Sequence, residues 1–309
     1  MRKDTIPFWD SVYNTVELGL PVAAVGQQGI GKSTTVVVLL KRLFLEAKTV
    51  VFLLRSVRNT SFFYKFNPDG SVEVFPESTG LTTIPALQDP EAYLIVDPGR
   101  TKDSCEFSPD LKAKLIICTS PDSRHWGGSS FAKRSGDENV LKGGLFRYYP
   151  PYSLEEAIAA GPFIDDRVTE RQIRDRFYRF GGTVRTIFGS DAEVQAAESE
   201  QDAAAKNINV ETTSKIVTNS ANLDAAKPSS SPDSLVGILS SSADDYKTKT
   251  TEVVSEYLGV MLATKAMADT CGSGGEEFKT GRYSSSTSLR FCFSLAKKSS
   301  RSASVSARN

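Results

Sequence analysis

The first half of the chain contains two kinds of apolar pattern. Unbroken apolar runs are typical of short strands buried on both faces of a parallel sheet. They occupy residues 22–25, 49–54, 93–97, 114–119 and 145–149. Apolar positions spaced three and four residues apart predict helices over residues 4–18 and 32–47. Strands that alternate with helices in this way predict an α/β fold with a parallel sheet flanked by helices.

A hairpin is inserted into this alternation. Residues 61–66 and 71–75 are both strand-like, and Asp69-Gly70 between them is a frequent hairpin turn. We therefore expect one antiparallel pair within an otherwise parallel architecture.

Two more helices are predicted beyond residue 150. Ser153 and Glu156 have the spacing of a capping box at a helix start. The second helix runs from about Thr169 to Phe180 and ends at Gly181-Gly182, a frequent helix stop.

Composition divides the chain into four parts. The alternating pattern predicts a first domain over residues 1–190, followed by a low-complexity linker over 191–244. Residues 245–270 regain a helical pattern. Residues 271–309 are rich in serine, and no acidic residue follows Gly281, so we expect a disordered basic tail.

Charge balance and a single histidine exclude several kinds of site. The 309 residues include 37 Lys+Arg and 37 Asp+Glu, so no global charge favours nucleic acid or an anionic membrane. His125 is the only histidine, which excludes His-rich zinc sites, two-His iron sites and HExxH helices. A Ser-His-Asp triad would have to use this one imidazole.

The sequence also predicts a soluble protein. No apolar run approaches the ~20 residues of a membrane span, and the N-terminus lacks the apolar region of a secretory signal. The four cysteines form no CxxC pair, and Cys118 lies in an apolar run, as core thiols do. We expect a cytoplasmic or nuclear protein with no membrane partner.

A complete phosphate-binding motif lies between the first predicted strand and the next helix. The sequence matches GxxxxGK[ST] in the strand–loop–helix context that the motif requires. Its glycines let successive N–H groups face an anion, its Lys reaches the β- and γ-phosphates, and its Ser hydroxyl ligates Mg²⁺. The predicted nucleotide-binding residues are Gly26, Gln27, Gln28, Gly29, Ile30, Gly31, Lys32, Ser33 and Thr34.

Asp97 closes an apolar strand and has the position and type of a Walker B aspartate, which holds Mg²⁺. Otherwise a carboxylate at a strand end serves as a helix cap. Many hydrolysing P-loop ATPases place Glu directly after this Asp, whereas Pro98 follows here. The sequence thus supports nucleotide binding more directly than hydrolysis.

Two other classes of P-loop protein carry different motifs. A GTPase DxxG switch would need glycine where Arg100 stands, and no NKxD motif follows on a later strand. A small-molecule phosphotransferase remains open, because such enzymes share the P-loop and bind their acceptor through scattered arginines.

Four further side chains are candidates for contact with the γ-phosphate. Thr119 ends the strand after Asp97, where a sensor residue would lie, and an exposed strand-end hydroxyl is the alternative. Arg124 and His125 follow in the next loop, on the carboxyl side of the sheet where ligands bind. Arg185 follows Gly181-Gly182 and is either a phosphate sensor or a solvated cation.

The chain resembles the P-loop ATPase module of Crinkler effectors and retrotransposon hot spot (RHS) proteins over about residues 5 to 190. The similar segments share motif positions with that family, although Val184 stands where the family's GGxPR pattern has proline. They are Gly29-Ile30-Gly31-Lys32-Ser33, Tyr93-Leu94-Ile95-Val96-Asp97, Thr119-Ser120-Pro121, Arg147-Tyr148-Tyr149-Pro150-Pro151 with the Leu154-Glu155-Glu156 helix start, and Phe180-Gly181-Gly182-Thr183-Val184-Arg185.

The resemblance implies a regulatory ATPase of the STAND-like type, in the additional-strand (ASCE) division of P-loop proteins. In this family the module is often coupled to a nuclease-like or kinase-like effector, which implies nucleic acid as a possible partner, and some members are exported into a host cell. Residues 191–309 contain no HNH pair and no kinase HRD or DFG set. The roles implied are phosphate and Mg²⁺ binding for Lys32 and Ser33, Walker B for Asp97, and sensing for Thr119 and Arg185.

Together these patterns predict an Mg²⁺-ATP-binding ATPase that acts as a switch, with a protein partner or self-assembly as its output. Its predicted catalytic residues are Asp97, Thr119, Arg124 and Arg185, and its metal ligands are Ser33 and Asp97. The alternatives are a nucleotide-binding interaction module without catalysis and a small-molecule phosphotransferase.

Overall fold

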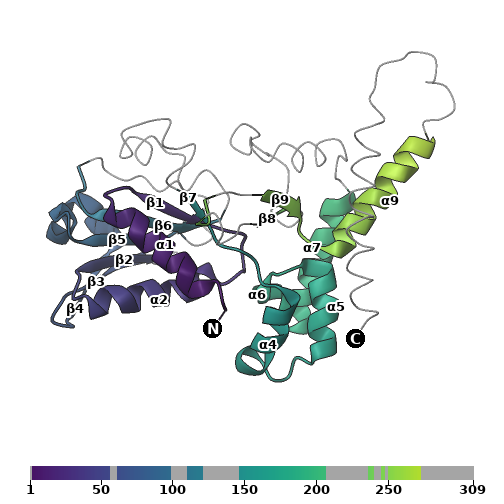
Figure 1. Ribbon diagram of the computed structural model, residues 1–309, viewed down its shortest axis with the longest axis horizontal. Helices are drawn as coiled ribbons and strands as arrows, with labels where there is room; N and C mark the ends of the chain where they lie inside the picture. The colour runs from purple at the N-terminus through teal and green to yellow at the C-terminus, as the bar shows by residue number, and fades with distance from the viewer. Residues whose placement is uncertain are drawn as a thin grey trace, which may run out of the picture. The chain divides into compact units, whose positions relative to one another are not determined.

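A computed structural model describes residues 2–55, 61–98, 110–120, 146–206, 236–239, 245–247 and 250–272 (Figure 1). The chain divides into two compact units. Unit 1 comprises Met1–Pro150 and Leu239–Lys249, and unit 2 comprises Pro151–Ile238 and Thr250–Asn309. The helices predicted just after residue 150 therefore belong to unit 2.

Unit 1 is built on a seven-stranded sheet in the order β4-β3-β2-β5-β6-β1-β7. The neighbouring strands β2, β5, β6, β1 and β7 run parallel to one another. Strands β3 and β4 form an antiparallel hairpin that pairs with β2. The predicted α/β fold with a mostly parallel sheet is confirmed. The strand bounds are β1 Val22–Val25, β2 Val50–Arg55, β3 Ser61–Phe66, β4 Val72–Pro76, β5 Tyr93–Asp97, β6 Lys114–Thr119 and β7 Phe146–Tyr148.

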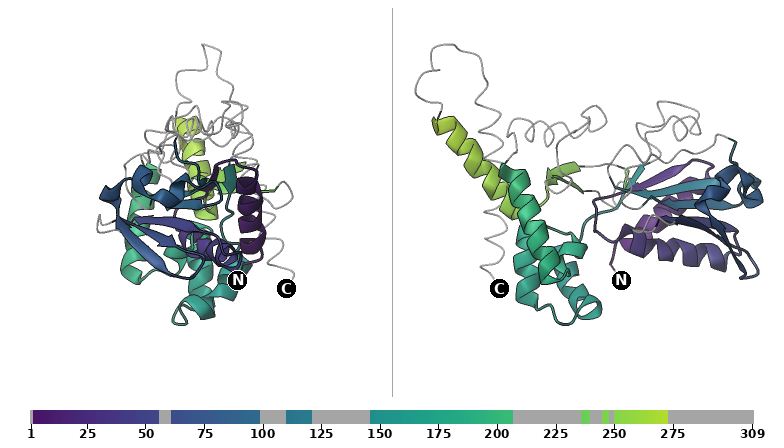
Figure 2. Two further views of the ribbon diagram at one scale, coloured as in Figure 1. Left: turned by 90° about the vertical axis from the view of Figure 1, so that its left-hand side faces the viewer. Right: turned by 180° about the vertical axis from the view of Figure 1, so that it is seen from behind.

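Helices α1 (Thr5–Glu17) and α2 (Lys32–Leu45) pack side by side on one face of this sheet (Figures 1 and 2). One buried apolar cluster joins both helices to alternate residues of the strands. The other face is buried as well, since Ala23, Leu94 and Ile117 are each 0% exposed. Burial on both faces explains why these strands are unbroken apolar runs. Three short 3-10 turns, η1 (Glu77–Thr79), η2 (Leu81–Thr83) and η3 (Pro85–Gln88), join β4 to β5.

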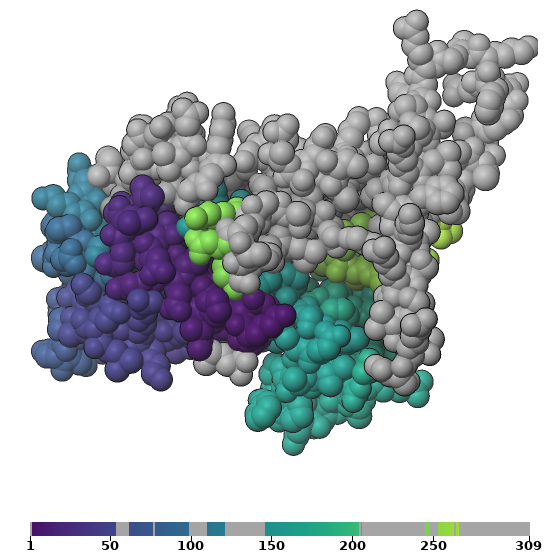
Figure 3. Space-filling model, in the orientation of Figure 1, coloured from purple at the N-terminus to yellow at the C-terminus, as the bar shows by residue number. Residues whose placement is uncertain are grey.

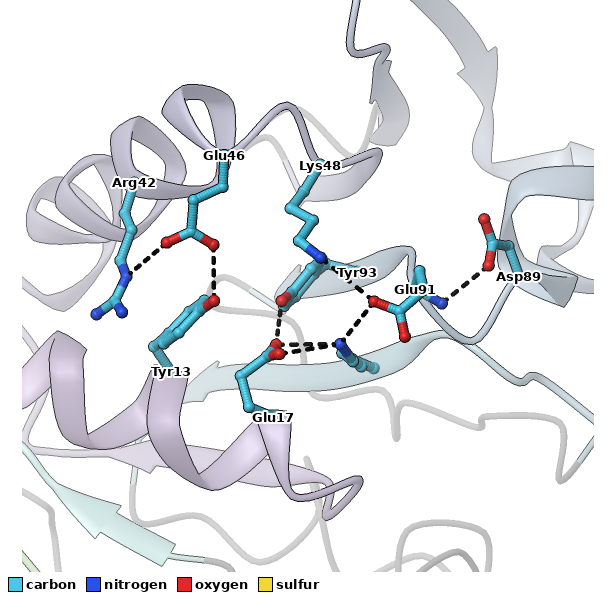
Figure 4. Close-up of polar contacts among 9 residues, drawn as sticks. Tyr13, Glu17, Arg42, Glu46, Lys48, Asp89, Glu91 and Tyr93 are labelled. Carbon is cyan, nitrogen blue, oxygen red and sulfur yellow. Dashed lines mark hydrogen bonds and ion pairs between the residues drawn. The ribbon is translucent and has the colours of Figure 1, made fainter.

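A polar network closes the edge of the sheet where β5 and β6 begin (Figure 4). Tyr93 Oη donates a hydrogen bond to the Glu17 carboxylate at the end of α1. Lys114 Nζ lies 3.1 Å from Glu17 Oε1 and 3.3 Å from Glu91 Oε2. Burial raises the pKa of the Tyr93 phenol, and the hydrogen bond to Glu17 adds to this. This network lies at the amino ends of the parallel strands. The candidate site lies at their carboxyl ends.

Unit 2 is mainly helical. Ser153 and Glu156 form the predicted capping box of α4, and Thr169 and Gln172 form a second one at α5. A small apolar cluster around Ala157, Ile173 and Ile187 holds its first helices together. The elements beyond residue 150 are α4 Leu154–Ile164, α5 Glu170–Phe180, α6 Val184–Ile187, α7 Asp191–Lys206, β8 Val236–Leu239, β9 Thr250–Val253 and α9 Glu256–Gly272.

Two expectations for this half of the chain were wrong in detail. Part of the predicted linker is helix α7, whose alanines and glutamates favour helix, and Ser190 and Glu193 exchange capping hydrogen bonds at its start. The helix expected over 245–270 begins only at Glu256, because the β-branched residues before it form β9. Of the tail predicted over residues 271–309, Cys271 and Gly272 are the last residues of α9, and residues 273–309 lie outside the described residues. None of the helices in the described part of the chain has the length and apolar character that a bilayer span requires.

Replacing Gly181 by alanine should destabilise unit 2 strongly. Gly181 has φ 61° and ψ −152°, a region almost confined to glycine, and an added Cβ would lie 1.9 Å from the carbonyl oxygen of Val254. We expect a loss of about 3 kcal/mol or more in the free energy of unfolding, measured by urea titration followed by circular dichroism. Gly161→Ala is the control, because its Cβ would lie 2.9 Å from the flexible end of the Ile173 side chain and in ordinary contact with Phe188, with no backbone atom in the way. Equal midpoints for the two variants would contradict this account.

Candidate functional site

The loop between β1 and α2 needs glycine at three positions. Gly29 and Gly31 have φ of 76° and 90°, which L-residues with side chains rarely adopt. A Cβ on Gly26 would lie 3.0 Å from the backbone oxygen of Tyr149 and 2.8 Å from the side chain of Ile30. The glycines of the motif therefore serve two purposes, turning the chain and allowing close approach of Tyr149, the residue that follows β7.

The ammonium group of Lys32 lies inside this turn. Lys32 is 8% exposed, and its Nζ donates hydrogen bonds to the carbonyl oxygens of Gly26 and, at 2.8 Å, of Gln27. A buried ammonium is tolerated only when it is hydrogen-bonded, so the loop wraps around a cation. This charge lies where the phosphates of a nucleotide would be expected.

The start of α2 adds a second positive element. The first N–H groups of a helix lack intrahelical partners and carry a partial positive charge. Ser33 and Thr34 lie in this first turn and are exposed, so their polar groups are open to a ligand. Ile30 is fully buried in the core, and its side chain therefore anchors the loop rather than contacting a nucleotide.

The ends of β6 and β5 complete the site. Val25 of β1 and Thr119 of β6 are register partners, and the amide of Gly26 donates to the carbonyl oxygen of Thr119 at 3.1 Å. Asp97 ends β5, the next strand in the sheet, and is 6% exposed. The carboxyl ends of β1, β6 and β5 thus lie next to one another at one edge.

Lys32 and Asp97 both influence the pKa of the buried thiol of Cys118. Burial raises the pKa of Cys118, the negative charge of Asp97 raises it further, and the positive charge of Lys32 lowers it. Cys118 belongs to the apolar cluster on the α1 and α2 face, and Asp97 follows Tyr93 and Ile95 of that cluster in the strand alternation. The ammonium and the carboxylate therefore act from the same side of the sheet.

The structure brings together most of the predicted site residues. Residues 26–34, Asp97 and Thr119 all lie at this edge of unit 1. Arg185 lies in α6 of unit 2, and Arg124 and His125 are outside the described residues. Thr119 is 2% exposed, so the alternative of an exposed strand-end hydroxyl was wrong, and its Oγ1 donates to the carbonyl oxygen of Ser120 at 3.1 Å.

Sequence patterns did not indicate a role for Tyr149 in the site. Its amide donates to the carbonyl oxygen of Val25 at 2.7 Å, and its own carbonyl oxygen packs on Gly26. These are backbone contacts, and only the run Tyr148-Tyr149-Pro150-Pro151 could have signalled an unusual segment here.

The described residues contain no cluster of three or more His, Cys, Asp or Glu side chains able to hold a metal ion. A divalent cation at this edge would be coordinated by Ser33, Asp97, water and the ligand's own oxygens. This is how Mg²⁺ is usually held beside phosphates.

No protein-family model, curated protein or solved structure matches the chain.

The thiol of Cys118 should resist alkylation and disulfide exchange in the folded protein. Only the thiolate reacts, and both burial and Asp97 disfavour it. In a variant with Cys105, Cys271 and Cys292 changed to serine, Cys118 is the one remaining thiol. We expect its reaction with Ellman's reagent at pH 8 to be about 100-fold slower or more in the native protein than in denaturing urea. Comparable rates would show that this strand end is open.

Proposed function

We propose that this chain is an Mg²⁺-ATP-binding P-loop protein that acts as a regulatory ATPase. The observation that supports it most is the Lys32 ammonium enclosed by a glycine loop at the start of α2. An incoming triphosphate would replace the two carbonyl oxygens that now accept from Lys32. The exchange would replace neutral acceptors by anionic ones and so add the attraction between the ammonium and the phosphate charge.

The strand order supports the same proposal. β6 lies between β1, which leads into the loop, and β5, which ends at Asp97. With neighbouring strands about 4.8 Å apart, the ends of β1 and β5 are separated by roughly 10 Å. That space suits a hydrated Mg²⁺ ion between Ser33 and Asp97. An intervening strand of this kind is typical of the ASCE division that the resemblance implies.

In this proposal Lys32 and the amides of residues 27–34 bind the phosphates, while the amide of Gly26 keeps its hydrogen bond to Thr119 and Gly26 shapes the loop. Ser33 and Asp97 hold Mg²⁺. Mg²⁺ would neutralise charge on the β- and γ-phosphates. Thr119 would contact the γ-phosphate side of the ligand, and Arg124 or Arg185 would supply a sensing cation. The regulatory role, with a protein partner or self-assembly as the output, is proposed from the resemblance to the Crinkler and RHS module.

One observation favours a second candidate function, a nucleotide-binding module without catalysis. Pro98 follows Asp97 directly and is buried. Proline offers no side-chain acceptor for a proton from attacking water. Binding and hydrolysis are therefore tested separately.

The binding test compares three variants by titration with a fluorescent ATP analogue. Lys32→Ala should weaken Mg²⁺-ATP binding about tenfold or more, because a charge-assisted hydrogen bond to phosphate is lost. Asp97→Asn should remove most of the Mg²⁺ dependence of the affinity. Lys41→Ala is the matched control, an exposed lysine on the same helix, and should leave affinity unchanged. Equal effects of Lys32→Ala and Lys41→Ala would refute the site.

The hydrolysis test measures ADP release from Mg²⁺-ATP by purified protein. We expect slow turnover in the wild type that Lys32→Ala abolishes, because the reacting phosphate would lose its position. Tight binding with no turnover would favour the second candidate. ADP release that depends on an added acceptor would instead indicate a phosphotransferase.

A further inference from the structure

A short segment from far along the chain completes unit 1 beside the candidate site. Residues 245–247, here called the strap, lie against α1, as the green patch beside purple atoms in Figure 3 shows. Tyr246 is 1% exposed and belongs to the same apolar cluster as Phe8 and Tyr149. Its carbonyl oxygen accepts a hydrogen bond from the amide of Tyr148 at 2.9 Å. The strap therefore contacts β7 on the side that faces away from β1.

Side chains of α1 and β7 also hold the strap. Tyr246 Oη donates to Asp4 Oδ1 at 3.1 Å, and Ser11 Oγ donates to the carbonyl oxygen of Asp245 at 3.1 Å. Arg147, itself 2% exposed, lies 3.4 Å from Asp245 Oδ2. The strap is therefore anchored through both backbone and side chains.

The backbone of the strap is strained. Asp245 and Tyr246 have φ of 60° and 59°, and consecutive left-handed residues that are not glycine are rare. Such conformations persist only where the surrounding contacts impose them. The docked position thus depends on the contacts with unit 1 and not on local preference, so loss of those contacts favours release.

Two paths connect Tyr246 to the phosphate loop. The backbone path runs through Tyr148 to Tyr149, whose amide bonds to Val25 and whose carbonyl oxygen packs on Gly26. The aromatic path runs through Phe8, whose ring lies 5.3 Å from that of Tyr246 and 4.7 Å from that of Tyr149, both edge-on. The strap and the loop thus contact opposite sides of the same Tyr148-Tyr149 segment.

We propose that Tyr246 is a positioning residue of the nucleotide site. The docked strap holds Tyr149 against Gly26 and keeps the loop in the shape that binds phosphate, and release of the strap lowers nucleotide affinity. This inference rests on the proposed function. Because coupling between two sites is reciprocal, nucleotide binding must also favour the docked strap. The part of the chain beyond residue 150 thereby gains a physical means of regulating the site.

The first test measures affinity for a fluorescent ATP analogue in the full chain. Tyr246→Ala should weaken binding about fivefold or more, in the usual range of coupling between sites. Tyr246→Phe keeps the ring and the backbone contact and should stay within about twofold. Tyr93→Ala and Tyr93→Phe are matched controls, because Tyr93 is an equally buried, hydrogen-bonded tyrosine. It lies at the amino end of β5, away from the phosphate loop. Equal effects at both positions would mean a general loss of stability and would overturn the proposal.

The second test measures amide hydrogen exchange in the wild-type protein. It does not depend on catalytic activity or on a variant. The amide of Tyr148 reports docking, since it donates to Tyr246, and the amide of Tyr93, which donates to Thr49, is the control. Saturating Mg²⁺-ATP should slow exchange at Tyr148 and leave Tyr93 unchanged. Unchanged exchange at Tyr148 despite bound nucleotide would overturn the proposal.

Exchange without nucleotide separates this proposal from the proposed function. Tyr246→Ala should speed exchange in residues 26–31 of the ligand-free protein, while Tyr93→Ala should not. If that result holds but the wild type binds no nucleotide, the proposed function fails and the coupling of strap and loop stands. If the wild type binds nucleotide and Tyr246→Ala changes neither affinity nor exchange, the coupling fails alone.

Discussion

A buried ammonium has to be hydrogen-bonded, and this requirement at Lys32 governs the geometry of the whole site. The carbonyl oxygens of Gly26 and Gln27 reach it only because the loop turns back through left-handed glycines. The loop in turn needs a fixed origin, which the hydrogen bond from Gly26 to Thr119 provides. The central strands, the glycine turn and the start of α2 are thus all linked to the Lys32 ammonium. A phosphate would be a stronger acceptor for this ammonium than the neutral carbonyl oxygens.

The central strands could be predicted because burial on both faces leaves an unbroken apolar run in the sequence. The same property hides their order, since a strand that is apolar on both sides carries no signal for its neighbour. Nothing local places β6 between β1 and β5, yet this order puts Thr119 against Gly26 and leaves Asp97 one strand away. The motif residues were therefore predictable one by one, whereas their arrangement follows from long-range pairing.

Two predictions for the second half of the chain were wrong for different reasons. In α7, alanine and glutamate favoured helix locally, but biased composition obscured the signal. At Tyr246, local pattern predicted helix, and the tertiary contacts with Phe8 and Tyr149 impose a left-handed backbone instead. Local preference and final structure disagree most at the strap, and such disagreement is expected where strain serves a function.

Hydrolysis at this site would need a group that takes a proton from water, and the predicted catalytic residues supply none readily. Arginine stays protonated, so Arg124 and Arg185 can only stabilise charge. The hydroxyl of Thr119 donates to a carbonyl oxygen and is a weak base at neutral pH. Asp97 as a metal ligand would have its negative charge committed to Mg²⁺. Under the proposed function, a site with this set would bind ATP and hydrolyse it slowly, so the lifetime of the bound nucleotide would be the quantity to regulate. The proposed coupling would act on that lifetime, because the strap contacts β7 beside the loop and not the residues predicted to touch the nucleotide.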